Sequence, residues 1–198
     1  MPVNLENHSD WQDLKRQISP LLQKCMNPHF PEGYTCAAVV VPLILVESDI
    51  CVLFTKRTAS VRDHQNQISF PGGACEPEDR TILETAIREM NEEIGISIPL
   101  NAILGALAPR TTVTGYFITP VIATLASLEN MKLNTREVER VILVPLKWLS
   151  DPNNHSVQPY SREGAFIENV IFFTPFQEEM IWGITAEIVL DFVHIIKK

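Results

Sequence analysis

Residues 70–96, FPGGACEPEDRTILETAIREMNEEIGI, contain a glycine pair followed by the signals of a helix start and a helix end. Asp79 or Thr81 can cap this helix, and Thr81 with Glu84 has the spacing of a capping box. Gly95 stands where a left-handed C-terminal cap is favoured. The stretch therefore predicts a loop–helix–loop, with a helix that runs from Thr81 up to Gly95.

Two neighbouring faces of this predicted helix differ in character. At about 100° per residue, one arc is apolar and consists of Leu83, Ala86, Ile87, Met90 and Ile94. The adjacent arc carries the carboxylates of Glu89, Glu92 and Glu93. We expect the apolar arc to be buried, with the carboxylates beside it.

A run of charges on a helix is usually a solvated face, but two physical facts favour another interpretation here. Carboxylates in the last turn lie at the negative end of the helix dipole, which costs roughly 0.3–1 kcal/mol each. They also repel one another at i,i+3 and i,i+4 spacing, and Arg88 is the nearest cation in the sequence. The cluster therefore predicts a divalent cation site, and carboxylate oxygens suit Mg²⁺ or Mn²⁺.

The glycine pair before the helix fits the same interpretation. Gly72 and Gly73 allow the backbone to approach a ligand closely and to point N–H groups toward a phosphate. On its own, such a pair more often marks a simple turn. Beside the glutamate cluster, it predicts one half of a metal-and-phosphate site.

Composition sets broad limits. The chain has 198 residues, enough for one domain with a sizeable core; 45% of them are hydrophobic and 20% are charged. No apolar run reaches the roughly 18 residues that span a bilayer, and the polar N-terminal stretch lacks the apolar part of a signal peptide. We therefore expect a cytoplasmic protein without a membrane partner. A net charge of −8 disfavours nucleic-acid partners, although a bound metal would still admit a small anionic substrate.

The four cysteines show no CxxC spacing; they are Cys25, Cys36, Cys51 and Cys75. In a cytoplasmic protein this pattern favours buried, reduced thiols over a structural zinc site or a disulfide framework. We therefore expect free thiols.

Strand-like runs and helical patterns alternate along the rest of the chain. A capping box at residues 9–12 predicts a first helix that ends near Gln23. Strands are predicted at residues 36–46, 50–56, 103–107, 116–125, 140–146 and 165–173, with a last helix at 185–196. Strands outnumber helices, and this order favours an α+β fold with a mixed sheet or an αβα sandwich.

The opening segment resembles the Nudix box: glycine, five residues, glutamate, seven residues, arginine-glutamate, an aliphatic, any residue, glutamate-glutamate, any residue, glycine, an aliphatic. Residues 88–96 agree with this pattern at every specified position. The first half departs from it, because eight residues rather than seven separate Asp79 from Arg88. In strict register the first glutamate falls on Arg80. We therefore expect a catalytic role for the three glutamates and not for the first acidic position.

One Nudix branch, the coenzyme A pyrophosphatases, shares this departure, and the resemblance runs from about Thr35 to Phe192. It rests upstream on residues 53–57 (LFTKR), Arg62, His64, Gln67 and 70–73 (FPGG), and downstream on residues 114–116, 119–121, 137–138, 144–146 and 182–186. Asn66 stands where the branch carries glycine. Because asparagine tolerates a left-handed backbone better than other non-glycine residues, we expect a left-handed turn at Asn66.

The resemblance implies one Nudix domain over residues 1–198, an αβα sandwich with a mixed sheet and a loop–helix–loop catalytic motif. Residues 1–33 would form an N-terminal helical extension, and the box would cover residues 73–96. The implied reaction is Mg²⁺- or Mn²⁺-dependent cleavage of coenzyme A or its thioesters to 4′-phosphopantetheine and adenosine 3′,5′-bisphosphate. A Nudix hydrolase of ADP-ribose or a dinucleotide, and a non-catalytic nucleotide-binding module, are the alternatives left open. The oligomeric state, including a homodimer, is also left open.

Residue roles follow from the chemistry and the resemblance together. Glu89 and Glu93 are expected metal ligands, and Glu92 is a third ligand or the general base. Arg88 is expected to hold a glutamate in place. Glu137 would add a carboxylate from elsewhere in the fold, with an exposed loop charge as the alternative. The substrate phosphates are expected to meet Arg57, Arg62, His64, Gly72 and Gly73, with surface ion pairs as the rival role for the three cationic side chains.

Overall fold

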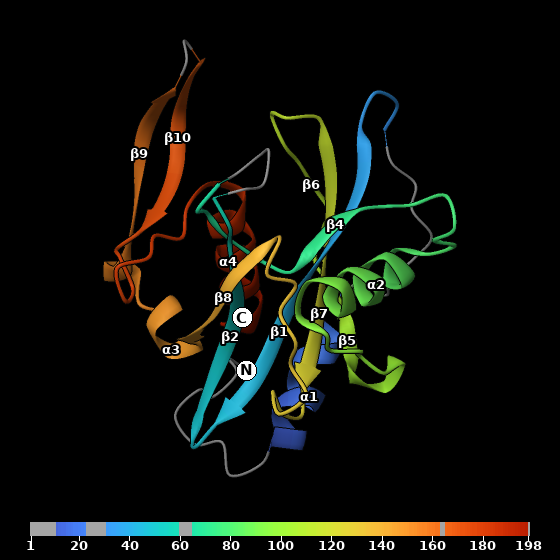
Figure 1. The fold of residues 1–198 in the computed structure, drawn as a ribbon. Coiled ribbons are helices and arrows are strands. Elements are labelled where there is room, and N and C mark those ends of the chain that lie inside the picture. Colours follow the sequence, from blue (N-terminus) through green and yellow to red (C-terminus); the bar gives the residue numbers. More distant parts are fainter. Residues whose placement is uncertain (1–10, 23–30, 60–64, 163–164, 198) are drawn as a thin grey trace.

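The computed structural model describes residues 11–22, 31–59, 65–162 and 165–197 (Figure 1). Its central sheet is formed by β1 (Thr35–Val46), β2 (Asp49–Arg57), β3 (Ile68–Ser69), β4 (Gly72–Ala74), β5 (Ile103–Ala106), β6 (Arg110–Thr111), β7 (Tyr116–Leu125) and β8 (Val138–Pro145). A separate hairpin consists of β9 (His155–Arg162) and β10 (Ala165–Phe173). The α-helices are α1 (Trp11–Ile18), α2 (Ile82–Ile94), α3 (Leu146–Leu149) and α4 (Gly183–Ile196). Short 3-10 turns are Ser19–Leu21, Leu100–Ala102 and Pro152–Asn154.

The sheet is mixed because β1 and β7 run parallel, while its other strand pairs are antiparallel. The order of its main path is β3-β2-β1-β7-β5, with β4 paired to β1, β6 to β7 and β8 to β2. β1 and β2 pair only near their connecting turn, where Leu43 faces Val52. Beyond that point, β1 pairs with β4 and β2 pairs with β3, so the segment that joins β3 to β4 lies between the two diverging strands.

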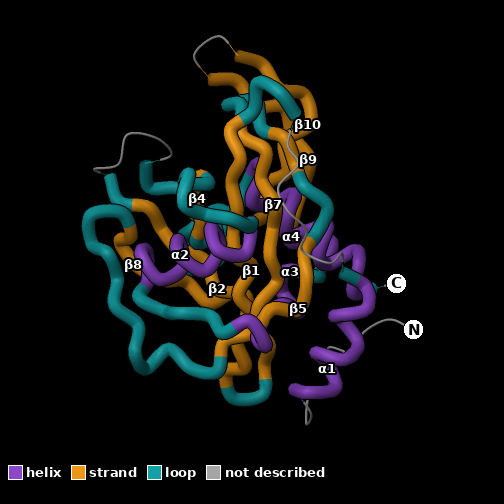
Figure 2. Tube along the Cα trace, turned by 90° about the vertical axis from the view of Figure 1, so that its right-hand side faces the viewer, coloured by secondary structure: helices purple, strands orange, loops and turns teal. Residues whose placement is uncertain are grey.

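Alternating residues of β1 supply two hydrophobic cores, one on each face of the sheet. Ala38 and Val40 pack with the apolar side of α2, whereas Val41 and Leu43 belong to the core that contains α4. Figure 2 shows α2 and α4 on opposite sides of the strands. The predicted αβα sandwich with a mixed sheet is therefore confirmed.

Helix α2 begins and ends as the sequence predicts. The Thr81 hydroxyl accepts a hydrogen bond from the Glu84 backbone N–H at 3.2 Å, and Gly95 is left-handed with φ +71°. The Glu84 carboxylate binds the backbone N–H of Arg80, at 2.7 Å, instead of returning to Thr81. The buried side of the helix consists of Ile82, Thr85, Ala86, Met90, Glu93 and Ile94, whereas Leu83 and Ile87 of the predicted stripe are half-buried.

Several predicted element limits were wrong. The first helix ends at Ile18 rather than near Gln23, because Pro20 disfavours continued α-helix and the chain passes into a 3-10 turn. Its predicted cap at residues 9–10 lies outside the described residues. The strand expected at 140–146 is Val138–Pro145, and Leu146 opens α3. Strands β3, β4, β6 and β9 were not predicted, since the first three are too short to show periodicity and β9 is polar and contains Pro159.

The expectation of free thiols was also wrong for one pair. Cys36 and Cys75 form a disulfide, with their Cα atoms 5.4 Å apart. The register of β1 with β4 brings them together, since Ala37 faces Ala74 and the Cys75 N–H binds the Cys36 carbonyl. A sequence separation of 39 residues gives no local sign of this pairing. Cys51 is free and buried, as expected.

Among the described helices, none combines the length and the apolar character needed to cross a bilayer.

The turn at Asn66 is left-handed, with φ +56°, which confirms the expectation for this position. Asn66→Gly should therefore leave the melting temperature nearly unchanged. Asn66→Val should lower the free energy of unfolding by about 1–2 kcal/mol, because a β-branched side chain is strained in this region. Thermal melts of the two variants measure the effect, and a harmless valine would contradict it.

Candidate active site

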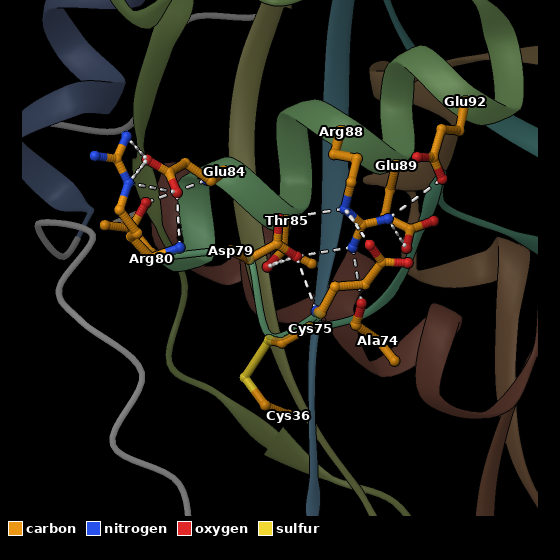
Figure 3. Close-up of polar contacts among 12 residues, drawn as sticks. Cys36, Ala74, Cys75, Asp79, Arg80, Glu84, Thr85, Arg88, Glu89 and Glu92 are labelled. Atoms are coloured by element: carbon orange, nitrogen blue, oxygen red, sulfur yellow. Dashed lines mark hydrogen bonds and ion pairs between the residues drawn. A yellow bond between two sulfur atoms is a disulfide. The ribbon is translucent and has the colours of Figure 1, made fainter.

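The site lies where the last turns of α2 meet the glycines of β4 and the end of β2. Figure 3 shows Arg88 and Glu89 projecting from α2 toward the chain around Ala74, with Asp79 approaching from the preceding loop. The glutamate cluster and the glycine pair are therefore neighbours in space, as the sequence predicts.

Arg88 contacts several polar groups of the site at once. Its guanidinium donates to both Asp79 oxygens at 2.8 and 3.2 Å, to the Ala74 carbonyl at 3.0 Å and to Glu89 at 2.8 Å. Glu92 accepts a longer bond of 3.3 Å. The contact with Arg88 lowers the pKa of Asp79, and the same contact raises the pKa of Arg88. Arg88 thus holds Glu89 in place, as expected, and spans the loop, β4 and α2.

Asp79 is a site residue whose role the sequence interpretation missed. Beyond its bonds to Arg88, it accepts from the Thr85 hydroxyl at 3.0 Å and from the Glu76 backbone N–H at 2.9 Å. Its side chain is only 7% exposed. The eight-residue spacing between Asp79 and Arg88 had argued against a role for Asp79. In the structure, however, the Asp79 side chain still reaches Arg88. The signal was present in the sequence as an acidic residue in the loop before the helix cap.

Glu93 is buried, with 2% of its surface exposed, and desolvation raises its pKa to about 8. Arg57, whose guanidinium lies 3.6 Å from the Glu93 carboxylate, opposes this shift, as does a backbone hydrogen bond from Gly72, while Glu89 and Glu137 reinforce it. Among the described residues, neither Glu93 Oε2 nor Arg57 Nε has a hydrogen-bond partner. A buried carboxylate oxygen and a buried N–H group, on two side chains that contact each other, therefore lack the hydrogen-bond partners that buried polar groups usually have.

Glu89 is held against Gly73 of β4. A Cβ atom at Gly73 would lie 2.5 Å from Glu89 Oε1, so only glycine leaves room for this carboxylate. Burial raises the pKa of Glu89, Arg88 lowers it, and Glu92 and Glu137 raise it further. Gly72 has a different reason to be glycine, since its Cβ would lie 2.3 Å from the Ala38 carbonyl of β1.

The remaining predicted residues differ in their placement. The Glu92 side chain is 54% exposed and lies at the outer side of Arg88. Glu137 is half-buried, accepts a hydrogen bond from Asn134 and influences the pKa of Glu89 and Glu93, so it lies toward the cluster rather than out in solvent. Arg62 and His64 lie outside the described residues.

The donor set fits a divalent cation. Among the described residues, no three carboxylate, imidazole or thiol groups converge closely enough to hold a metal ion by themselves. Mg²⁺ commonly uses one or two protein carboxylates and completes its shell with water and substrate phosphates. Glu89 and the unpaired oxygen of Glu93 offer such a partial set.

Together, the αβα sandwich and the carboxylates of α2 beside the glycines of β4 are typical of one class: a hydrolase with a loop–helix–loop catalytic motif. The profile of the NUDIX domain matches residues 35–179. The chain therefore belongs to the Nudix hydrolase family and is a pyrophosphatase acting on nucleoside diphosphate derivatives.

Similar proteins agree with this placement. A Nudix hydrolase NudL of Photorhabdus laumondii is 35% identical over 153 residues, covering 77% of this chain and 80% of the relative. A NudL of Pectobacterium atrosepticum is 34% identical over 153 residues, covering 77% and 78%. The crystal structure of a MutT/nudix family protein from Enterococcus faecalis superimposes with a TM-score of 0.61 at 16% identity, covering 87% of this chain and 66% of that one. This last likeness concerns the fold.

The two glycines give a matched pair of variants. Gly72→Ala should lower the melting temperature, because its methyl group meets rigid backbone of β1. Gly73→Ala should keep most of the stability and lose hydrolysis, because the Glu89 carboxylate can move aside but then leaves its position. Melting curves and rates on one pyrophosphate substrate separate the two effects; equal stability losses with equal activity would contradict them.

The buried Glu93 predicts a pH dependence of the metal-free protein. Between its ordinary pKa of 4.5 and the raised value of about 8, the folded chain holds a proton that the unfolded chain has released. The stability from this group is therefore full below about pH 4.5 and is lost as the pH rises, at most about 1.4 kcal/mol per pH unit. Denaturation in chelator at pH 5 to 8 should show this slope for the wild type and a smaller one for Glu93→Gln. Identical slopes would mean that Glu93 does not titrate in this range.

Proposed function

We propose that the chain is a Mg²⁺- or Mn²⁺-dependent pyrophosphatase that cleaves coenzyme A or its thioesters to 4′-phosphopantetheine and adenosine 3′,5′-bisphosphate. The observation that carries the metal dependence is the buried, unpaired carboxylate oxygen of Glu93 at the negative end of α2. A carboxylate in this position is destabilising in the absence of a cation and becomes favourable beside one. The Glu93 carboxylate therefore serves ligand binding rather than folding.

The chain's own residues would divide the work. Glu89 and Glu93 hold the cation, with Glu137 as a further carboxylate toward the same cluster. When bound, a divalent cation neutralises phosphate oxygens and makes a water molecule more acidic. Glu92 or Glu93 would accept the proton of the attacking water, since a carboxylate beside the cation can act as a general base.

Phosphate binding would involve the glycines of β4 and Arg57. Gly73 keeps the backbone free of a side chain beside Glu89. The Arg57 guanidinium lies 3.6 Å from the Glu93 carboxylate, and its Nε has no hydrogen-bond partner among the described residues. Arginine suits bidentate contact with phosphate. Arg62 and His64 remain proposed substrate contacts on sequence grounds alone.

The choice of coenzyme A rests on the upstream signature, LFTKR at residues 53–57 followed by Arg62, His64, Gln67 and FPGG. ADP-ribose or a dinucleotide is the alternative substrate class. A non-catalytic module is disfavoured, since all three box glutamates are present and two of them are half-buried or buried in the site.

The proposed partners are small molecules, with no nucleic acid or membrane, and the proposed compartment is the cytoplasm. A homodimer stays an open alternative.

Substrate choice is tested by comparing hydrolysis of coenzyme A, dephospho-coenzyme A, ADP-ribose and diadenosine polyphosphates with Mg²⁺ or Mn²⁺. We expect coenzyme A to be preferred, and its dephospho form to be poorer because the 3′-phosphate can meet Arg57 or Arg62.

The rate should vanish in chelator. Glu93→Gln should lose orders of magnitude and also gain less thermal stability from metal than the wild type. Preference for ADP-ribose would overturn the coenzyme A proposal, and unchanged rates in Gln variants of all three box glutamates would overturn catalysis at this site.

A further inference from the structure

The loop of residues 132–137 is fastened to the end of the catalytic helix. The Lys132 N–H donates to the Ile94 carbonyl at 2.9 Å, and the Asn134 N–H donates to the Glu93 carbonyl at 2.9 Å. Carbonyls in the last turn of a helix have no partner within the helix itself. The loop supplies two of these partners and thereby fixes its own position relative to Glu93.

Within this loop, Asn134 uses every polar group that it has. Its side-chain Nδ2 donates to Glu137 Oε1 at 3.1 Å, and its Oδ1 accepts from the Arg136 N–H at 3.3 Å. Its carbonyl accepts from the N–H groups of Glu137, at 2.9 Å, and Val138, at 2.8 Å. Asn134 therefore joins the catalytic helix, through its backbone, to the carboxylate of Glu137, through its amide.

A return connection closes this set of contacts into a ring. The Glu137 carbonyl accepts from the Thr58 N–H at 2.8 Å, and Thr58 follows Arg57, whose guanidinium lies 3.6 Å from the Glu93 carboxylate. The ring runs from Glu93 through Asn134, Glu137 and the end of β2 back to Glu93. Three separate parts of the chain are thus held around one buried carboxylate.

The carboxylate of Glu137 needs such a holder. It contributes to the raised pKa of both Glu89 and Glu93, and a carboxylate near other carboxylates is repelled wherever they are ionised. Without a hydrogen-bond donor on the side of the cluster, the half-buried Glu137 side chain would turn toward water. The amide of Asn134 is a donor that the structure places against this carboxylate.

We propose that Asn134 is a positioning residue, which holds the Glu137 carboxylate at the metal-binding cluster in fixed relation to the turn of α2 that carries Glu93. The proposal rests on the proposed function, since it takes Glu137 to belong to the catalytic site. The role requires an amide: an aspartate would set a second carboxylate about 3 Å from Glu137, whereas the Oδ1 contact with Arg136 would survive.

The test compares Asn134→Asp, Glu137→Gln and the double variant Asn134→Asp/Glu137→Gln. In the double variant, the glutamine amide can donate to the aspartate, so the contact is remade with its donor and acceptor exchanged. Melting temperature, kcat, KM and the Mn²⁺ concentration for half-maximal rate are measured for each. Asn153→Asp is the matched control, because Asn153 donates in the same way to Asp151 in a turn outside the site.

We expect Asn134→Asp to lower kcat by about 10- to 100-fold and to raise the Mn²⁺ requirement, with KM for substrate little changed. The double variant should regain the melting temperature lost in Asn134→Asp but keep the low rate of Glu137→Gln. Asn134→Asp should therefore add no further loss of rate once residue 137 is glutamine. Asn153→Asp should retain the wild-type rate.

Two results of the rate measurements would overturn the proposal. One is the same fold-loss from Asn134→Asp in both backgrounds, which would mean that Asn134 acts by a route other than Glu137. The other is a wild-type rate for Glu137→Gln while Glu93→Gln is inactive, which would remove Glu137 from the site and leave the proposed function standing. If coenzyme A is not cleaved, the rise of the melting temperature with Mn²⁺ reports on the same cluster without a substrate: a smaller rise in Asn134→Asp than in the wild type supports the proposal, and an equal rise contradicts it.

Discussion

The guanidinium of Arg88 is the interaction on which the arrangement of the site depends. Carboxylates at the C-terminal end of a helix oppose both the helix dipole and one another. Arg88 offsets this by binding Asp79, Glu89 and Glu92 while also donating to the Ala74 carbonyl. Its planar set of donors serves several acceptors at once in fixed directions, which a lysine ammonium could not do. The loop before α2, strand β4 and the helix are therefore set relative to one another by one side chain.

Burial of Glu93 adds a second constraint, which destabilises the folded protein where the contacts of Arg88 stabilise it. A carboxylate removed from water costs free energy unless it is paired, and Arg57 lies at 3.6 Å, a loose contact. The fold offsets this cost elsewhere, through apolar packing on both faces of the sheet. In the metal-free protein the active site is thus a local weakness within a well-packed structure, as is common where function and stability compete.

The sequence allowed the central part of this structure to be predicted, because its signals are local. The cap at Thr81, the left-handed Gly95 and the glutamate face of α2 all follow from residues within a few positions of one another. The same holds for the turn at Asn66 and for the long strands with dense β-branched composition.

What escaped prediction depends on contacts between distant segments. The disulfide follows from the register of β1 with β4, and β4 itself is too short to show a pattern. Asn134 looks like an ordinary loop residue until the fold places it between Glu93 and Glu137. Asp79 was set aside because spacing was counted along the chain, whereas the loop geometry brings it to Arg88.

The parallel pairing of β1 with β7 has a consequence for how the protein folds. Thr35 faces Tyr116, so this pairing closes a stretch of chain that contains β2, Gly72 and Gly73 of β4, and the whole of α2. Closing so long a stretch of chain costs conformational entropy. Proteins dominated by such non-local contacts fold more slowly than those built from local contacts. During synthesis, the catalytic helix leaves the ribosome before its sheet is complete. The turn of α2 that carries Glu93 therefore acquires its contact with Asn134 only after β7 and the loop that follows it have been made.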